Sequence, residues 1–378
     1  MGKVLVYSSD SMGLVKPDIS SFAKIKVLGI GGGGGNAINS MIASGTIKGV
    51  DFVAANTDVQ ALLTSQAPIK VQIGANLTKG LGAGANPELG REAAQESSDK
   101  IKELLLDTDM VFITCGMGGG TGTGGAPIIA QVSKETGALT VAVVTRPFLF
   151  EGSRRQAVAD EGIEELKKYV DTLIVIPNQR LLDVVDKKMT LLEAFRMADS
   201  ILGQGVQSIS DLITTPGLIN VDFADVRTIM TDAGTALMGI GVGSGDGRAV
   251  TAARSAINSP LLEVNLEGAK GILFNIIGGP NLSMTEVNEA AEIISQAADP
   301  DANIIFGATI DEDMGDQIKV SVIGAGFDEN RQTMKKFISS SRMKTGGKKI
   351  DDEDKQPPND EPEPEDEFDI PAFLRQGR

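Results

Sequence analysis

Short apolar runs alternate with glycine-rich turns and amphipathic stretches over the first half of the chain. The apolar runs predict strands, and stretches with apolar residues three and four positions apart predict helices. The predicted strands are 25–30, 50–55, 69–73, 110–114, 139–145 and 172–176, and the predicted helices are 37–45, 87–106, 123–136 and 151–168. Because strands that are apolar on both faces must be covered on both faces, this half is expected to form a parallel sheet between two layers of helices.

A long helix is predicted after this alternating region. Ten apolar residues between Leu191 and Ile213 recur at helical spacing, which predicts one helix of about 24 residues and about 36 Å. The helix is too apolar to be a solvated linker, so we expect it to pack between two parts of the protein. The later pattern is typical of a smaller mixed α/β unit, with predicted strands 235–243, 271–278, 303–310 and 317–324 and predicted helices 247–257 and 284–298.

The two ends of the chain differ from the rest. Residues 1–22 show little periodicity and are expected to form a flexible N-terminal arm. Residues 342–367 begin basic and continue as Asp, Glu and Pro with few apolar side chains, which predicts a disordered linker with an acidic character. Residues 368–378 regain apolar side chains and are expected to be a docking tail peptide, the alternative being a terminus without a partner.

Composition narrows the chemistry that the chain can perform. The 378 residues include no histidine and one cysteine, Cys115, which excludes a Ser-His-Asp triad, a histidine-ligated metal and an intramolecular disulfide. The net charge of −16 argues against broad binding to nucleic-acid phosphates. The chain contains no run of 18 uncharged apolar residues, so no membrane-spanning helix is expected. No secretory signal is expected at the start. Catalysis is therefore expected from carboxylates, hydroxyls, Lys, Arg, backbone amides or a bound cation.

Three glycine-rich loops are candidate phosphate sites. The first (29–36) and the second (116–124) each follow a predicted strand and lead into a predicted helix, where backbone amides can bind an anion. The third (80–86) could close over a terminal phosphate, and no P-loop motif occurs. One such loop fits a dinucleotide site or a turn without ligand, whereas two in one sheet predict a polyphosphate held from two sides. The candidates are Gly32, Gly33, Gly34, Gly35, Asn36, Gly82, Ala83, Gly84, Gly118, Gly119, Gly120, Thr121, Gly122 and Thr123.

Three motifs point to a known family. Residues 118–124 (Gly-Gly-Gly-Thr-Gly-Thr-Gly), 220–225 (Asn-Val-Asp-Phe-Ala-Asp) and 369–375 (Asp-Ile-Pro-Ala-Phe-Leu-Arg) closely resemble the motifs of the FtsZ family, the tubulin-like GTPases of bacterial cell division. The resemblance covers residue 24 to about residue 327 and the tail. It implies a tubulin-like α/β fold with a Rossmann-type parallel-sheet GTPase subdomain (23–189), a central core helix (190–214) and a smaller mixed α/β subdomain with a catalytic loop (215–341).

The resemblance also implies a nucleotide site that extends beyond the loops. It assigns Glu151 to the ribose hydroxyls and Arg155 to the edge between ribose and phosphate, although a plain helix N-terminus is the alternative. Asn178 follows a strand end, where its amide could pair with the edge of a base. Phe195 and Asp199 share a helix face, so Phe195 could lie on the base while Asp199 accepts both N1–H and the 2-amino group of guanine. On the residues alone, two alternatives stay open: Phe195 could pack in the core instead, and Asp199 could lie on a solvated face of the helix.

The catalytic candidates are Asp222, Asp225 and Asn220. Asp222 and Asp225 are three residues apart and face one way, an arrangement that also fits a helix cap. The phosphate loops lie at the opposite end of the long helix, so these carboxylates are expected to act on the next subunit in a head-to-tail polymer. There they would orient the attacking water, directly or through a cation, while Asn220 holds the loop or contacts the same phosphate.

Cofactors and partners are implied by the resemblance. They are GTP and GDP, Mg²⁺ with the triphosphate, a monovalent cation at the interface as a further candidate, other copies of the chain, and membrane adaptors and division regulators that bind the tail at 368–375. The implied location is cytoplasmic, at the mid-cell division ring, without nucleic acid or direct membrane insertion. The main alternative is a nucleotide-sensing polymer scaffold with little turnover. An NAD-type oxidoreductase is the weaker alternative, since it leaves 118–124 and 220–225 unexplained.

Overall fold

The computed structural model of the chain describes residues 23–182, 189–215, 217–260, 266 and 268–327, all within the compact unit Met1–Asp328. The predictions for 1–22, 342–367 and 368–378 lie outside the described residues. The strands are β1 (Ile25–Ile30), β2 (Val50–Asn56), β3 (Ile69–Gln72), β4 (Met110–Gly116), β5 (Leu139–Arg146), β6 (Thr172–Pro177), β7 (Gly234–Ser244), β8 (Gly271–Gly278), β9 (Asn303–Ile310) and β10 (Gln317–Ala325).

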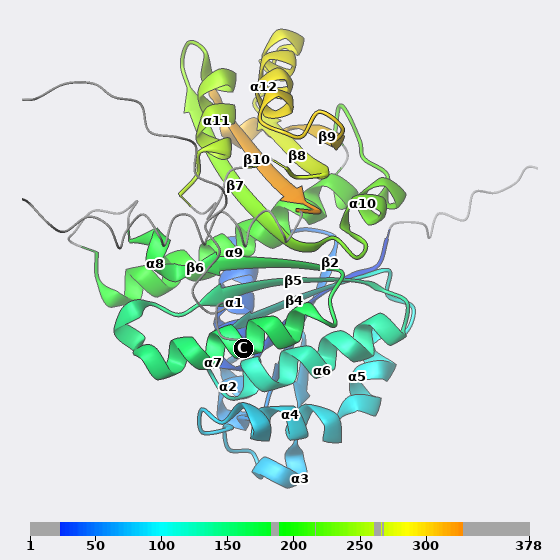
Figure 1. Cartoon of the computed structure of the whole chain (residues 1–378), viewed down its shortest axis with the longest axis vertical. Helices are drawn as coiled ribbons and strands as arrows, with labels where there is room; N and C mark the ends of the chain where they lie inside the picture. The colour runs from blue at the N-terminus through cyan, green and yellow to red at the C-terminus, as the bar shows by residue number, and fades with distance from the viewer. Residues whose placement is uncertain (1–22, 183–188, 216, 261–265, 267, 328–378) are drawn as a thin grey trace, which may run out of the picture. The chain divides into compact units, whose positions relative to one another are not determined.

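Helices alternate with these strands along the chain (Figure 1). They are α1 (Gly31–Ser44), α2 (Val59–Thr64), α3 (Ala75–Thr78), α4 (Pro87–Glu96), α5 (Ser98–Leu105), α6 (Thr121–Glu135), α7 (Ser153–Lys167), α8 (Asn178–Leu181), α9 (Leu191–Thr214), α10 (Phe223–Met230), α11 (Arg248–Ile257) and α12 (Met284–Gln296), with short 3-10 turns at Leu149–Glu151 and Glu312–Met314. No helix in the described part of the chain has the length and apolar character needed to cross a bilayer.

The strands form one ten-stranded sheet in the order β3-β2-β1-β4-β5-β6-β7-β10-β8-β9. The first seven pair in parallel, with β1 between β2 and β4 as in a Rossmann-type sheet. Strand β7 joins the two halves, because it runs parallel to β6 and antiparallel to β10. The described chain therefore has the expected α/β architecture, in which a Rossmann-type parallel half is continued by a mixed half in the same sheet.

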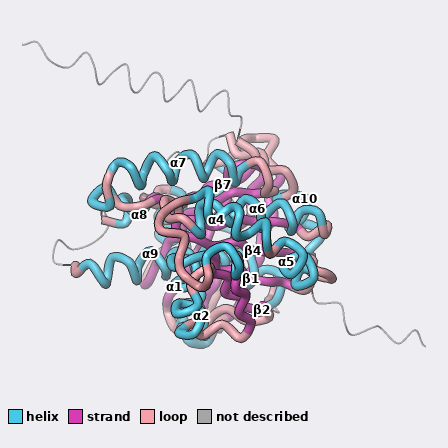
Figure 2. The backbone as a smooth tube through the Cα atoms, turned by 90° about the horizontal axis from the view of Figure 1, so that it is seen from below, coloured by secondary structure: helices cyan, strands magenta, loops and turns pink. Residues whose placement is uncertain are grey.

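Alternate residues of the parallel strands enter two different cores. One core contains residues such as Val27, Phe112 and Val141 together with α1, α9 and α10. The other contains their sequence neighbours, such as Leu28 and Ile113, together with α4, α5, α6 and α7. Figure 2 shows the helices on the two sides of the strands. This alternation confirms the predicted sheet with helices on both faces, since successive strand residues point to opposite faces.

Helix α9 is the long helix that the sequence predicts, and it spans 24 residues. Thr190 caps its N-terminus, where the Thr190 hydroxyl accepts from the Glu193 amide and the Glu193 carboxylate accepts from Thr190. The helix packs against α1, β5 and β8, so it touches both halves of the sheet. At 1.5 Å per residue, α9 is a rigid spacer of about 36 Å.

Two predicted helices differ in the structure. Helix α1 begins at Gly31 instead of residue 37, because packing against the second glycine loop holds the glycine run in helical form at about 1 kcal/mol per glycine in lost propensity. The predicted helix 87–106 is two helices, which break at Ser97. The buried Ser97 hydroxyl accepts a hydrogen bond from the Gly74 amide at 3.0 Å, and that long-range contact has no signal in the local pattern.

A partly buried ion pair connects two helices of the mixed half and makes the stability of this half depend on pH. Arg248 Nε lies 2.6 Å from Glu286 Oε1 and lowers the pKa of Glu286 to about 2. The ionised carboxylate therefore contributes its full stabilisation above pH 4.5, and the contribution disappears as the pH falls toward 2. Arg248→Met should lower the free energy of unfolding at pH 7 by about 2 kcal/mol.

Urea unfolding followed by circular dichroism at a series of pH values checks this expectation. The difference between wild type and Arg248→Met should shrink between pH 4.5 and pH 2. Arg91→Met, which removes an exposed pair with Glu88, is the matched control and should change stability by less than about 1 kcal/mol. A difference that stays constant down to pH 2 would contradict the assignment.

Candidate functional site

Helices α1 and α6 begin at the carboxyl ends of two neighbouring strands, β1 and β4. Within the described residues, neither helix has a side-chain cap or an acidic residue in its first turn. The first four amides of a helix have no partner inside the helix, and the helix dipole makes that end positive. Two uncapped N-termini at adjacent strand ends therefore make a site suited to a polyanion such as a chain of phosphates.

Glycine lets the first loop pack directly on the second. A Cβ added to Gly34 would lie 2.5 Å from the Thr114 carbonyl oxygen, and one added to Gly33 would lie 3.1 Å from the Gly116 amide nitrogen. Gly32 and Gly35 differ, because no described atom lies within 4 Å of the Cβ that either would carry. The inner glycines thus hold the two loops together, and the outer ones leave room for a ligand to approach the backbone.

The third glycine loop closes on the second. A Cβ on Gly120 would come 2.8 Å from the Ala83 Cβ and 2.9 Å from the Asn86 amide nitrogen. Gly82 and Gly84 have open space where their side chains would be, as far as the described atoms extend. The structure therefore brings together all three glycine loops that the sequence singles out, although they are separated by up to about 90 residues in the chain.

The threonine hydroxyls of the second loop have partners inside the protein. Thr123 Oγ1 accepts a hydrogen bond from the Gly118 amide at 2.9 Å, across the loop. Thr121 Oγ1 lies 2.8 Å from Thr57 Oγ1, and all of these hydroxyls are buried. These contacts fix the loop around Gly119, whose position is half-buried.

A pocket beside the glycine loops brings together the predicted residues of the later chain. It is lined by parts of α1, β4, β5, α7, α8 and α9, and its members from the predicted set are Gly33, Asn36, Glu151, Arg155, Asn178, Phe195 and Asp199. Glu151 Oε2 lies 3.3 Å from Arg155 Nε, and Glu151 Oε1 accepts from the Phe148 amide at 2.8 Å. The Glu151 carboxylate is therefore held in place from two directions.

Two polar groups in this pocket are poorly satisfied by the protein. Asn178 is buried, and its Oδ1 has no hydrogen-bond partner among the described residues. Burial raises the pKa of Asp199 to about 6, so the carboxylate is ionised at neutral pH but incompletely solvated. Buried polar atoms normally have partners, and their absence here fits a ligand that supplies hydrogen-bond donors.

Phe195 offers an aromatic surface next to these groups. Its ring is 38% exposed and packs edge-on against Phe148, with ring centroids 5.5 Å apart. A second edge-on contact is made with Phe150 at 6.4 Å. The ring is thus neither fully buried in the core nor free in solvent, and aromatic rings held in this way can receive a flat heterocycle.

The three catalytic candidates lie elsewhere. Asn220, Asp222 and Asp225 are exposed, and none lines the pocket in the part of the chain that the structure describes. Asp199 and the end of α9 at Thr214 are about 22 Å apart along the helix. The structure therefore keeps this group apart from the glycine loops of its own chain.

The loop that carries these candidates is held by its own side chains. Asn220 Oδ1 accepts from the Gly217 amide at 2.6 Å, and Asp222 caps α10 by accepting from the Ala224 amide at 3.3 Å. Asp225 lies in the first turn of α10, and within the described residues its carboxylate has no hydrogen bond or ion pair. Asp225 is thus the carboxylate that is available to a group outside this chain.

Several pocket residues are absent from the sequence-based candidates. They are Gly116, Met117, Thr145, Pro147, Ala198 and Leu202. Thr145 lies at the carboxyl end of β5, the strand next to β4, and Pro147 follows that strand. Open parallel sheets bind ligands at this edge, so the position of both residues in the predicted sheet carries the signal. Ala198 and Leu202 have no such signal, because apolar residues on α9 look alike whether they line a core or a pocket.

Metal ligands are sparse in this site. No group of three or more Asp, Glu or Cys side chains is placed to hold a metal ion in the described residues. Mg²⁺ needs few protein ligands when phosphates supply its oxygen donors, so this donor set fits an ion that arrives with a polyphosphate.

Comparison with known proteins identifies, over most of the chain, the same family that the sequence motifs resemble. Residues 24–186 match the GTPase domain of the Tubulin/FtsZ family, and residues 234–328 match the C-terminal domain of the FtsZ family. An FtsZ dimer from M. jannaschii, solved empty, is 49% identical and superposes with a TM-score of 0.77 over 80% of this chain and 88% of its own. A point mutant of FtsZ from M. jannaschii is also 49% identical, with a TM-score of 0.78 over 81% and 91%.

More distant structures share the fold. CetZ2 from Haloferax volcanii, solved as a protofilament with GTPγS bound, is 18% identical and has a TM-score of 0.70 over 86% of this chain and 100% of its own. At that identity the likeness concerns the architecture alone.

The reactivity of the single thiol, Cys115, measures how tightly the second glycine loop is packed. Cys115 is fully buried under the loop, and burial raises its pKa to about 12. At pH 8 the native protein should not react with an aromatic disulfide reagent over an hour, and one equivalent should react after denaturation in guanidinium. Labelling of the native protein within minutes would mean that the loop opens readily, contrary to its packing here.

Proposed function

The chain belongs to the FtsZ family of tubulin-like GTPases, and on that basis we propose that it binds GTP in the pocket beside α1 and α6 and hydrolyses it within a head-to-tail polymer of its own copies. The observation that carries the proposal is the separation of the pocket from Asp222 and Asp225 by the C-terminal part of α9, about 22 Å from Asp199 to Thr214. One copy therefore supplies a nucleotide pocket and a second copy supplies the carboxylates. A head-to-tail contact of this kind does not close on itself and produces filaments.

The phosphates are bound by backbone amides. The first turns of α1 and α6 donate to the α-, β- and γ-phosphates from two sides, and the outer glycines Gly32, Gly35 and Gly119 allow close approach. Gly82 and Gly84 cover the terminal phosphate from the third loop. Glu151 accepts hydrogen bonds from the ribose hydroxyls, and Arg155, which pairs with Glu151, faces the edge between ribose and phosphate.

Guanine is selected by side chains that lack partners in the protein. Asp199 accepts N1–H and the 2-amino group, and the unpaired Asn178 oxygen and amide pair with another part of the base edge. Adenine has neither of the two donors that Asp199 requires, so ATP would leave this half-buried carboxylate unpaired. Phe195 covers the base with its exposed face.

Hydrolysis depends on the neighbouring subunit. Asp225 accepts a hydrogen bond from the water that attacks the γ-phosphorus, and it orients that water in line with the leaving β-phosphate oxygen. The amides of α1 and α6 stabilise the negative charge that develops on the phosphate oxygens. Asp222 and Asn220 hold the loop, consistent with the hydrogen bonds that they make in this chain. Mg²⁺ bound with the triphosphate would neutralise part of the phosphate charge.

The proposed cellular role follows from polymer formation and from the tail. Polymers of the chain form the cytoskeletal ring of the division site, and the apolar tail at 368–375 binds membrane adaptors and division regulators. The subdomain boundaries are 23–189 for the nucleotide half, 190–214 for the core helix and 215–341 for the half that serves the neighbour. The similarity to FtsZ from M. jannaschii, solved as a dimer, supports self-association.

Base selection can be tested by replacing one carboxylate oxygen of Asp199 with an amide nitrogen. Asp199→Asn keeps one acceptor and replaces the other with a donor, which matches the N1–H and C2 carbonyl of xanthine. The variant should bind GTP about 100-fold more weakly than wild type and should gain affinity for XTP, as measured by fluorescent-nucleotide displacement at pH 8. Asp211→Asn is the matched control, since Asp211 is a buried carboxylate on the same helix with a pKa near 6, and it should keep the preference for GTP. Equal loss of GTP and XTP binding in Asp199→Asn would argue against the base contact.

Catalysis by the neighbour can be tested at Asp225. Asp225→Ala should bind GTP and polymerise as wild type does, but should release phosphate at least about 100-fold more slowly per polymerised subunit. Pelleting of polymer and phosphate release, measured in the same sample, separate assembly from turnover. Normal turnover in Asp225→Ala polymers would overturn the catalytic assignment. If wild-type polymers also release no phosphate, the result would favour the alternative function, a nucleotide-sensing polymer scaffold with little turnover.

A further inference from the structure

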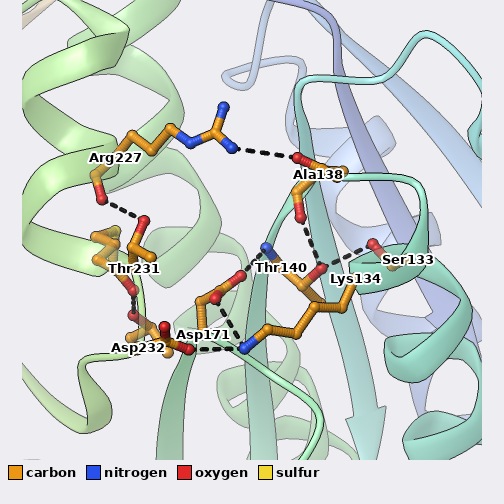
Figure 3. Close-up of polar contacts among 11 residues, drawn as sticks. Ser133, Lys134, Ala138, Thr140, Asp171, Arg227, Thr231 and Asp232 are labelled. Atoms are coloured by element: carbon orange, nitrogen blue, oxygen red, sulfur yellow. Dashed lines mark hydrogen bonds and ion pairs between the residues drawn. The ribbon is translucent and has the colours of Figure 1, made fainter.

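Helix α10 is attached at its C-terminal end to the half of the protein that carries the pocket (Figure 3). Arg227 Nη2 donates to the Gly137 carbonyl oxygen at 3.3 Å. The Thr172 hydroxyl donates to the Met230 carbonyl oxygen. Lys134 Nζ lies 2.7 Å from Asp232 Oδ1, just past the end of the helix. Towards its other end the same helix carries Asp225 in its first turn and Asp222 as its N-cap, about 8 Å and about 12 Å from Met230 at 1.5 Å per residue.

Lys134 is the centre of this attachment. Its Nζ also lies 3.1 Å from Asp171 Oδ1, so one ammonium bridges two carboxylates from different parts of the chain. The Asp171 side chain is 6% exposed and that of Asp232 is 73% exposed, so the bridge runs from the sheet to the surface. Hydrogen bonding to Asp232 and Asp171 raises the pKa of Lys134, which keeps the ammonium charged at neutral pH.

Asp171 is a fixed point in the sheet. Its amide donates to the Thr140 carbonyl oxygen at 2.9 Å, and its own carbonyl oxygen accepts from Gly234 at 3.0 Å, so it connects β5, β6 and β7. The second carboxylate oxygen accepts from the Thr140 amide at 2.9 Å. Lys134 therefore reaches α10 from a carboxylate that three hydrogen bonds to the backbone or side chain of Asp171 hold in place.

The turn that receives Lys134 is shaped for this contact. Asp232 has a φ of +49°, in the left-handed region that Asp and Asn tolerate better than most residues. The preceding residue, Thr231, ends α10, and its hydroxyl donates to the Arg227 carbonyl oxygen at 2.7 Å. Asparagine at position 232 would preserve the backbone while removing the charge, which makes Asp232→Asn a clean probe.

Apolar packing alone does not define the orientation of α10. Val226, Ile229 and Met230 are buried, and the helix packs against β5, β8 and β9. Hydrophobic contact is not directional, whereas a charge-assisted hydrogen bond fixes both a distance and a direction. The polar contacts at the C-terminal end of α10 thus fix that end in both distance and direction.

We propose that Lys134, through its bridge between Asp171 and Asp232, is a positioning residue for hydrolysis in the neighbouring subunit. The inference rests on the proposed function of Asp225. Lys134 lies in the last turn of α6, whose first turn binds phosphate in the proposed site, so one helix of about 22 Å links the pocket of a subunit to the carboxylate that it offers its neighbour. Removing the bridge allows α10 to tilt and lowers the fraction of polymer contacts in which the water is aligned.

The test compares Lys134→Met, Asp232→Asn and the double variant with wild type. Each should bind GTP with unchanged affinity at concentrations below the assembly threshold, and KM should stay unchanged. The turnover per polymerised subunit should fall about 3- to 5-fold in Asp232→Asn, since its pair with Lys134 is exposed and has a modest energy, and at least as much in Lys134→Met, which also removes the pair with Asp171. The double variant should be no slower than Lys134→Met, because both changes remove the same contact. Lys102→Met, which removes an exposed pair with Glu135 on the same helix α6, is the matched control and should retain wild-type turnover.

The outcomes separate this inference from the proposed function. Wild-type turnover per polymerised subunit in Lys134→Met and Asp232→Asn, together with an inactive Asp225→Ala, would overturn the positioning role and leave the shared site intact. Normal turnover in Asp225→Ala would remove the proposed function and the inference with it. A loss of turnover that only follows a loss of polymer, or an equal loss in Lys102→Met, would show that the bridge supports folding or assembly instead.

Discussion

The uncapped N-termini of α1 and α6 at two adjacent strand ends are the feature on which the rest of the site depends. The positive ends of the two helices favour an anion between them, and only glycine lets the two loops pack this closely against each other. The parallel sheet makes the arrangement possible, because it places the carboxyl ends of β1 and β4 at one edge. The adjacent pocket, which we propose receives the base, is formed by the next strand ends and by α9.

Two helices, α9 and α6, connect the pocket side of the protein with the two ends of α10. Helix α9 runs about 36 Å from the pocket side to the loop before α10, so it separates the pocket from Asp222 and Asp225. Helix α6 runs from the glycine loop to Lys134, which holds the far end of α10. A filament-forming GTPase gains from this layout, since a monomer with a complete pocket would have an incomplete catalytic site. Turnover would then occur only where two copies meet.

Much of the architecture follows from local pattern, and the exceptions have physical causes. The pattern of apolar runs and helical stretches predicts all ten strands of the described sheet, because buried strands leave a clear apolar signal. The start of α1 was not predicted, since five glycines disfavour a helix until Thr114 and Gly116 pack against them. The partnerless Asn178 oxygen and the bridge from Lys134 to Asp232 also have no local signal, because each depends on residues far apart in the chain. The roles of the site residues remain predictions from the motifs and from this geometry.

The most direct test of a site shared between subunits is phosphate release from GTP, with ATP as control, over a range of protein concentrations. A site shared between subunits predicts no release with ATP and a GTP rate that appears above a threshold concentration, where polymer also begins to form. Above the threshold, the rate should rise in proportion to the polymerised protein. A GTP rate that is strictly proportional to total protein at all concentrations would mean that each monomer holds a complete site, and it would contradict the central claim.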